Sequence, residues 1–186
     1  MNAALDIRKD EFISFEDYLV GEEEAEERHE YCNGDVEMMA GASDNHELVA
    51  GNIFAAIHGH FRGKGCRVYK GDMKLRFKTP LVDLGYYPDL MVVCDPKDDQ
   101  THYKERPKLI IEVMSRMQSD LAEKLFIYQQ IESVEEYLVL DQSPEEPKAW
   151  LYGRGQEWKI KAPITGGSID LASIDFSFDL ADLYVA

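Results

Sequence analysis

The segment from Tyr86 to Tyr128 constrains this chain most, because two short apolar runs in it each carry one carboxylate. The first run, YYPDLMVVCDP, contains Asp89, and the second, PKLIIEVMS, contains Glu112. Both runs are aliphatic or β-branched and are bounded by Pro, Asp or Ser, which is typical of buried strands. A carboxylate in a buried strand is costly unless it is paired or binds a cation. Two such carboxylates in successive strands therefore predict one shared cation.

The run that follows, RMQSDLAEKLFIYQQ, predicts a helix over about residues 119–131. Asp120 and Lys124 are four residues apart, so they lie one turn apart on one face of this helix. They could form an ordinary surface ion pair, worth about 0.3–0.5 kcal/mol. We favour a role in a functional site, because the pair comes directly after the strand of Glu112.

In this order, these residues resemble the PD…(D/E)xK motif of metal-dependent nucleases. Pro88-Asp89 matches its first element and Ile111-Glu112-Val113 its second, although a valine and not a lysine follows the glutamate. Asp120 and Lys124 resemble the D-x-x-x-K helix of the Uma2 family (DUF820), in which the lysine has moved from the strand to the next helix. The family usually has a Ser-Pro-Ser-Thr-like turn where this chain has Ser115–Gln118. The segments that carry the resemblance are Tyr31–Gly34, Met38–His46, Tyr87–Asp89, Glu112–Ser115, Asp120–Tyr128 and Glu136–Asp141.

The resemblance implies an α/β fold of the restriction-endonuclease-like class, with a mixed sheet core flanked by helices and with added β-hairpins. It implies a metal-dependent endonuclease that hydrolyses phosphodiester bonds of DNA with Mg²⁺ or Mn²⁺. It also implies a homodimer, since nucleases of this architecture often cut two strands with two sites.

The implied roles follow from what phosphodiester hydrolysis needs, namely an activated water and neutralised phosphate charge. Asp89 and Glu112 would bind the metal, with the backbone carbonyl of Val113 as a third ligand. Lys124 would stabilise the developing negative charge or orient the attacking water. Asp120 would fix Lys124 or lie near the metal.

Residues 43–61 predict a helix with Ser43 or Asp44 as its N-cap and one apolar stripe. His46 lies at the N-terminal end of that stripe. The resemblance implies a catalytic helper of metal or phosphate at this position. The alternative is a core histidine with its hydrogen bonds satisfied, which is the commoner case, and the sequence leaves both open.

Asn33-Gly34 between two short strand-like runs predicts a hairpin with a type I′ turn. Glu30 or Glu37 in this hairpin could point toward the metal site. We favour solvent-facing strand carboxylates, because glutamate is seldom buried.

Composition predicts one domain, residues 1–186, of an ordinary globular protein, with 45% apolar and 30% charged residues. No apolar run approaches the roughly 20 residues of a membrane span, and the N-terminus shows no secretory signal. A cytoplasmic protein with no membrane association is therefore expected. Its three cysteines, Cys32, Cys66 and Cys94, have neither a disulfide framework nor zinc spacing, so buried reduced thiols are expected.

The net charge of −16 opposes binding to a polyanion, but the charge is unevenly distributed. Residues 61–80 hold seven basic residues and one acidic residue. Two strands, residues 66–70 and 73–78, are predicted here with a turn at Gly71-Asp72. Lys74, Arg76 and Lys78 alternate with apolar residues and so share one face. This basic face could contact DNA, or it could be a solvated strand face, and charge alone does not decide between them.

Further predicted elements are a helix within residues 14–27, a strand at 136–140, a hairpin formed by 150–152 and 157–161, and a strand with a final helical turn in 164–184. Motifs of phosphate loops, dinucleotide sites and nucleophile elbows are absent from the sequence. A nuclease-like protein that binds DNA or a protein without cutting remains the alternative, as does a structural dimer. The acidic charge and the missing strand lysine both favour the protein that binds without cutting, whereas two buried carboxylates favour the enzyme.

Overall fold

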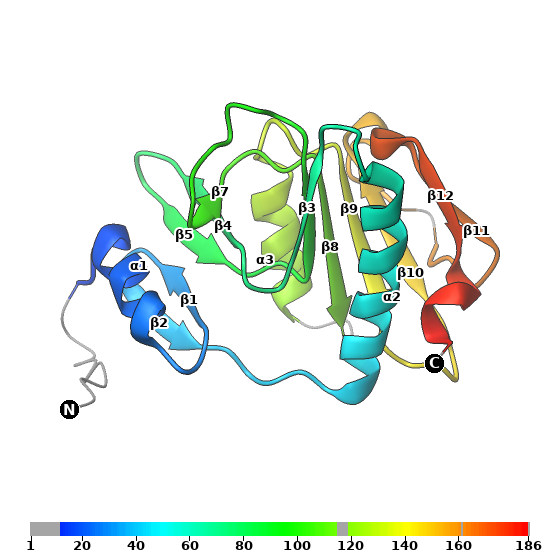
Figure 1. Cartoon of the computed structure of the whole chain (residues 1–186), viewed down its shortest axis with the longest axis horizontal. Helices are drawn as coiled ribbons and strands as arrows, with labels where there is room; N and C mark the ends of the chain where they lie inside the picture. Colours follow the sequence, from blue (N-terminus) through cyan, green and yellow to red (C-terminus); the bar gives the residue numbers. More distant parts are fainter. Residues whose placement is uncertain (1–11, 115–118, 161, 186) are drawn as a thin grey trace.

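The computed structural model describes residues 12–114, 119–160 and 162–185. Two five-stranded sheets form most of the molecule (Figure 1). The central sheet has the strand order β10-β9-β8-β6-β3, and the lateral sheet has the order β2-β1-β5-β4-β7. The strands of the central sheet are β3 (Arg67–Lys70), β6 (Leu90–Val93), β8 (Leu109–Met114), β9 (Glu136–Asp141) and β10 (Ala149–Gly153). Those of the lateral sheet are β1 (His29–Cys32), β2 (Asp35–Met38), β4 (Lys74–Lys78), β5 (Asp83–Tyr86) and β7 (Tyr103–Lys104).

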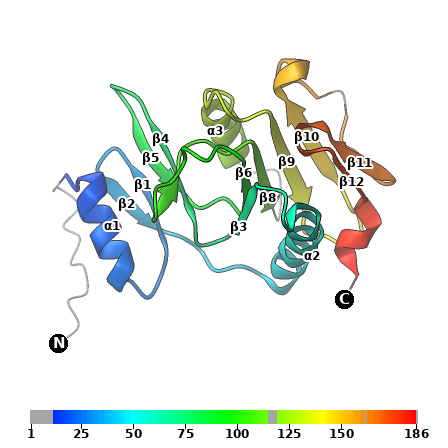
Figure 2. The same ribbon diagram turned by 45° about the horizontal axis from the view of Figure 1, so that its top comes forward.

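The central sheet is mixed, because β8 and β9 run parallel while its other pairs are antiparallel. Helix α2 (Asp44–Phe61) covers one face and helix α3 (Ser119–Tyr128) covers the other (Figure 2). A two-stranded sheet of β11 (Ser168–Leu171) and β12 (Phe176–Asp179) packs on the α2 side together with the 3₁₀ turn Leu180–Tyr184. This mixed sheet between helices, with added hairpins, confirms the predicted fold class.

The side chains of strand β8 alternate between the two faces of the central sheet, and this alternation determines which of them face the site. Leu109, Ile111 and Val113 belong to the apolar core under α2, whereas Ile110 belongs to the core under α3. Because side chains alternate along a strand, Glu112 faces α3, as its contacts below confirm.

Several local predictions are confirmed. The predicted helix over residues 43–61 is α2, and the Ser43 hydroxyl accepts a hydrogen bond from the N–H of His46. Asn33 and Gly34 have φ angles of 50° and 100°, as a type I′ turn requires. The predicted helix at 14–27 is the shorter α1 (Phe15–Glu24), and α3 ends at Tyr128, before residue 131.

The two strands predicted at residues 66–70 and 73–78 are present as β3 and β4, but they belong to different sheets and do not pair with each other. Strand β3 pairs with β6 in the central sheet, and β4 pairs with β5 and β7 in the lateral sheet. The chain crosses between the sheets at Gly71, and it crosses a second time between β5 and β6. A hydrogen bond joins the two segments that cross between the sheets, because the Gly71 N–H donates to the Asp89 carbonyl oxygen at 3.0 Å.

The run YYPDLMVVCDP does not form the single strand that was predicted, because Tyr86 ends β5 and Leu90 begins β6. Residues 87–89 form a bend between β5 and β6, so Asp89 lies at the start of β6 and not within a strand. Pro88 has no N–H to donate to a sheet, which favours a break at this point.

The predicted strand at residues 157–161 is absent from its described part, 157–160. Glu157 and Trp158 have φ angles of 52° and 59°, and this left-handed backbone cannot continue a strand. β10 pairs instead with β9, and Ala149 forms an isolated bridge with Ile164.

The expectation of three reduced, buried cysteines is corrected by the structure. Cys66 and Cys94 form a disulfide, because the pairing of Arg67 with Val93 places the two cysteines opposite each other at the ends of β3 and β6. Cys32 is a free, exposed thiol. Within the described residues, no helix is long and apolar enough to cross a membrane.

Candidate active site

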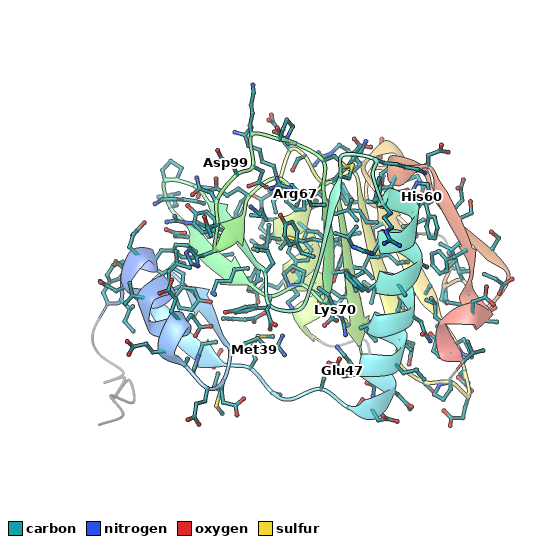
Figure 3. All side chains as sticks on the ribbon, viewed as in Figure 1. Met39, Glu47, His60, Arg67, Lys70 and Asp99 are labelled. Carbon is teal, nitrogen blue, oxygen red and sulfur yellow. A yellow bond between two sulfur atoms is a disulfide. The ribbon has the colours of Figure 1, made fainter. Side chains whose placement is uncertain are left out.

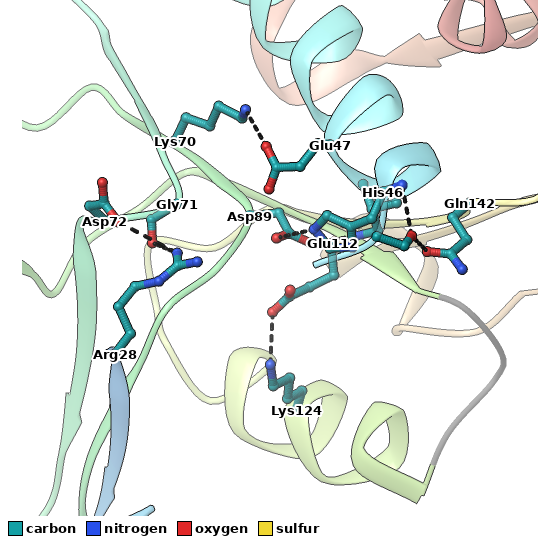
Figure 4. Close-up of polar contacts among 12 residues, drawn as sticks. Arg28, His46, Glu47, Lys70, Gly71, Asp72, Asp89, Glu112, Lys124 and Gln142 are labelled. Atoms are coloured by element: carbon teal, nitrogen blue, oxygen red, sulfur yellow. Dashed lines mark hydrogen bonds and ion pairs between the residues drawn. The ribbon is translucent and has the colours of Figure 1, made fainter. Parts of the chain in front are cut away.

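Asp89 is held at the crossing between the two sheets by two hydrogen bonds. Its Oδ2 accepts from the backbone N–H of Val113 at 2.7 Å, and its Oδ1 lies 2.9 Å from His46 Nε2 (Figure 4). The first contact ties the bend before β6 to the end of β8. The second ties it to the first turn of α2. The carboxylate is therefore fixed where these three elements meet.

Glu112 projects from β8 beneath α3 and is 5% exposed. Its Oε1 accepts from the Tyr128 hydroxyl at 3.0 Å and lies 3.3 Å from Lys124 Nζ. Burial is the main reason that the pKa of Glu112 rises to about 7, and the nearby Asp89 charge adds to the rise while Lys124 opposes it. This site thus holds a carboxylate whose negative charge is incompletely neutralised by its neighbours.

Lys124 lies on the inward face of α3, and its ammonium contacts two carboxylates. It lies 3.3 Å from Glu112 Oε1 and 3.4 Å from Glu30 Oε1. Burial lowers its pKa, but the charges of Glu112 and Glu30 outweigh burial, so the pKa of Lys124 is raised above its ordinary value. The ammonium is therefore charged at neutral pH.

His46 lies in the first turn of α2, and its side-chain partner is Asp89. The hydrogen bond to Asp89 raises the pKa of His46, while burial opposes this. His46 is hydrogen-bonded, as the alternative of a satisfied core histidine requires, but it is only partly buried and lines the same cleft as Asp89, so these contacts do not decide between that alternative and a catalytic role.

The side chains of these residues line a cleft of about 360 Å³ between the helices and the sheet crossing. Met39 lines this cleft, and Figure 3 shows Met39 and Lys70 between the lateral sheet and α2. Lys70 is paired there with Glu47 at 3.1 Å. The residues that line the cleft are Met39–Ser43, His46, Tyr87, Asp89, Glu112–Met114, Lys124 and Gln142.

The other predicted site residues are placed as follows. Val113 holds Asp89 through its N–H, while its side chain packs into the core under α2. Asp120 is the second residue of α3, but its side chain lies outside the described part of the chain. Because side chains alternate, Met114 and not Val113 shares the side of Glu112, and Met114 lines the cleft. Met114 therefore holds the position of the lysine that the strand lacks.

The predicted basic face of β4 is not an open surface. Arg76 is 6% exposed and forms a bidentate pair with Asp83 at 2.9 and 2.7 Å, above the ring of Phe15. Lys74 is half-buried with its ammonium 5.0 Å from the centre of the Tyr87 ring. The three basic residues do share one face, but Phe15 and Tyr18 of α1 pack over Arg76 and Lys74, which charge counting could not show.

Two residues at the site, Tyr128 and Gln142, were not predicted from the sequence, and for Glu30 the favoured alternative is wrong. Tyr128 was expected only as a core residue, yet its hydroxyl binds Glu112. Gln142 follows β9 and accepts from Ser43 at 2.8 Å at the edge of the cleft. Glu30 was expected in solvent, but it contacts Lys124, whereas Glu37 is exposed as expected. The one available signal for Glu30 was its place beside the hairpin turn.

The donor set fits a hard divalent cation. Asp89 and Glu112 supply carboxylate oxygens at one cleft, and Mg²⁺ is commonly bound by one or two carboxylates while it keeps several waters. A cation there would relieve the cost of burying Glu112. Among the described residues, no group of three or more His, Cys, Asp or Glu side chains forms a metal cluster, so waters and the Val113 carbonyl would have to complete the shell.

Comparison with solved structures identifies the class of fold. A crystal structure described as a putative nuclease belonging to DUF820, from Anabaena variabilis, matches with a TM-score of 0.68 at 13% identity, covering 86% of this chain and 91% of that one. At this identity the match shows the fold alone, which is a mixed α/β architecture.

Sequence comparison then gives the family. Residues 14–180 match the model of Uma2, described as "Putative restriction endonuclease", and the chain belongs to this family. Two uncharacterized Synechocystis proteins are similar along nearly their whole length. Slr1290 is 28% identical, covering 92% of this chain and 91% of its own. Sll1609 is 29% identical, covering 87% and 91%. The family description supports a nuclease.

Proposed function

We propose that this protein is a metal-dependent endonuclease that hydrolyses phosphodiester bonds of DNA. The observation that carries the proposal is the convergence of Asp89, Glu112 and Lys124 on one cleft. They come from a bend, a strand and a helix that are separate in sequence. Their chemistry, two hard oxygen ligands beside one ammonium, is what phosphoryl-group hydrolysis uses.

Asp89 and Glu112 would hold Mg²⁺ or Mn²⁺, with the Val113 carbonyl as a third ligand. When bound, such an ion activates water and neutralises phosphate charge. Val113 and His46 keep the Asp89 carboxylate in place through their hydrogen bonds to its two oxygens. Lys124, charged and directed into the cleft, would stabilise the negative charge that develops on the phosphate.

Incubation of the purified protein with supercoiled plasmid and with single-stranded DNA, in Mg²⁺ or Mn²⁺ and in EDTA, tests this proposal. We expect cutting that EDTA abolishes and that Asp89→Asn and Glu112→Gln each reduce by at least about 10²-fold. Glu47→Gln is a matched control, because Glu47 lies on α2 near the cleft but pairs with Lys70. Cutting that survives both site substitutions would come from elsewhere.

DNA would reach the cleft past the basic residues of 61–80 that stay accessible. Lys78 is exposed, and Lys74 is half-buried beside Tyr87, which lines the cleft. We expect Lys74→Gln with Lys78→Gln to weaken DNA binding and to reduce the salt slope by about 0.9 for each phosphate that is no longer neutralised. Arg76 is excluded from this set because its guanidinium donates hydrogen bonds to Asp83. An unchanged slope would place the DNA surface elsewhere.

We further propose a homodimer, which would place two sites on one duplex. Light scattering at micromolar concentration should give twice the mass of 21.3 kDa. A monomer under these conditions would remove this part of the proposal.

A binding module that does not cut is the second candidate function. It is favoured by the internal pairing of the site, because His46 and Val113 already engage Asp89, and two carboxylates already engage Lys124. DNA retention in a filter assay without any cutting in Mg²⁺ or Mn²⁺ would support this candidate over the enzyme.

A further inference from the structure

We propose that Glu30 is a positioning residue that holds the ammonium of Lys124 in the active site. The proposal rests on the endonuclease function proposed above. It concerns how the lysine reaches the phosphate from a helix, when the strand beside Glu112 carries Met114 instead.

Glu30 reaches Lys124 across the boundary between the two sheets. It lies on β1 of the lateral sheet, whereas Lys124 lies on the helix that covers the central sheet. Glu30 Oε1 is 3.4 Å from Lys124 Nζ. This oxygen is buried and has no hydrogen-bond partner among the described residues. The ion pair with Lys124 is therefore what compensates the burial of this charged atom.

The ammonium of Lys124 is confined from several sides. Glu112 Oε1 lies at 3.3 Å, Glu30 Oε1 at 3.4 Å, and the centre of the Tyr86 ring at 5.6 Å. A lysine side chain is otherwise flexible, with four carbons between the backbone and the charge. Two carboxylates from separate elements restrict it far more than one would, because each fixes the distance to a different point.

Glu30 becomes the more important partner of Lys124 when Glu112 binds a metal ion. A divalent ion held by Asp89 and Glu112 would repel the ammonium and would weaken its attraction to Glu112. The attraction to Glu30 does not depend on that carboxylate. Glu30 would therefore keep the ammonium at the site when the metal-bound carboxylate no longer can.

The hairpin offers a matched control. Glu37 stands directly across from Glu30 in the β1–β2 register, carries the same charge and is exposed. A Glu37→Gln change therefore removes the same charge from the same hairpin without touching Lys124.

The kinetic test compares Glu30→Gln, Glu30→Asp and Glu37→Gln in plasmid cutting. We expect Glu30→Gln to lower kcat by about 10²-fold, as a misplaced catalytic group does, with KM and Mn²⁺ affinity nearly unchanged. Glu30→Asp should recover part of the loss, and Glu37→Gln should cut as the parent does. A Glu30→Gln enzyme with parental kcat overturns the proposal. Loss of Mn²⁺ binding in calorimetry also overturns it, because Glu30 would then be a metal ligand.

Unfolding keeps this test separate from the proposed function. If the parent protein cuts no DNA, the endonuclease proposal fails, and a double-mutant cycle in urea then decides whether Glu30 positions Lys124. We expect Glu30→Gln to lower the unfolding midpoint of the parent. In a Lys124→Met background the same change should leave the midpoint unchanged or raise it, because it removes an unpaired carboxylate. Equal shifts in both backgrounds would overturn the proposal.

Discussion

Replacing Lys124 by methionine removes the charge that the buried Glu112 and the partly buried Glu30 share, while the apolar stem of the side chain is kept. At 3.3 Å and an effective dielectric constant of about 20, one carboxylate attracts the ammonium by about 5 kcal/mol. Removing the ammonium from water costs several kcal/mol, which offsets part of that attraction. The net loss of stability is therefore about 3–5 kcal/mol, the range found when one partner of a buried pair is removed.

The loss of stability caused by Lys124→Met should increase as the pH rises. The pKa of Glu112 in the folded protein is raised to about 7 from 4.5, so the folded metal-free protein loses stability as the pH rises through this interval. Without Lys124 the pKa of Glu112 rises further, and the loss continues to higher pH. The stability difference between parent and Lys124→Met should therefore be larger at pH 8 than at pH 5.

Urea unfolding in EDTA at pH 5 and pH 8 measures this difference. Glu123→Gln on the same helix is a suitable control, since Glu123 is exposed and its carboxylate meets the hydroxyl of Tyr86 instead. In the cutting assay Lys124→Met should be about 10²–10³-fold slower, with no loss of Mn²⁺ affinity. A variant as stable as the parent at pH 8, or one that cuts at the parental rate, would refute the assigned role of Lys124.

Two further predictions concern the strand lysine and the lateral sheet. Met114→Lys in the Lys124→Met background should recover part of the cutting, because Met114 lines the cleft on the side of Glu112. No recovery would show that side chains at positions 114 and 124 do not reach the same phosphate. Asp83→Asn should cost about 3 kcal/mol in urea unfolding at pH 7, because it leaves Arg76 buried without its partner. Burial raises the pKa of Asp83, but the charge and hydrogen bonds of Arg76 outweigh burial, so the pKa lies below its ordinary value of 3.8. The stability that the ionised Asp83 gives the parent protein is therefore lost as the pH falls below 3.8. A gap that persisted in strong acid would contradict the pairing.

Local signals predicted the parts of the fold that depend on neighbouring residues. The N-cap of α2, the Asn33-Gly34 turn and the carboxylate of Glu112 within a buried strand all follow from patterns of a few residues. Asp89 lines the same cleft as Glu112, although the break at Pro88 places it before its strand.

The features that the sequence could not predict depend on contacts between distant residues. Nothing near Gly71 indicates that β3 and β4 join different sheets, because this depends on the pairing of β3 with β6. The disulfide of Cys66 with Cys94 depends on that same register. The contact of Glu30 with Lys124 requires both sheets to be in place, and periodicity carries no information about it.

The central claim is that Asp89 and Glu112 bind one divalent cation beside Lys124, and a Mn²⁺-soaked crystal tests it most directly. We expect an anomalous-difference peak in the 360 Å³ cleft, with oxygens of both carboxylates at about the 2.1 Å distance of a Mg²⁺-type site. A crystal at saturating Mn²⁺ with no peak between these two carboxylates, or with a peak only at other residues, would contradict it.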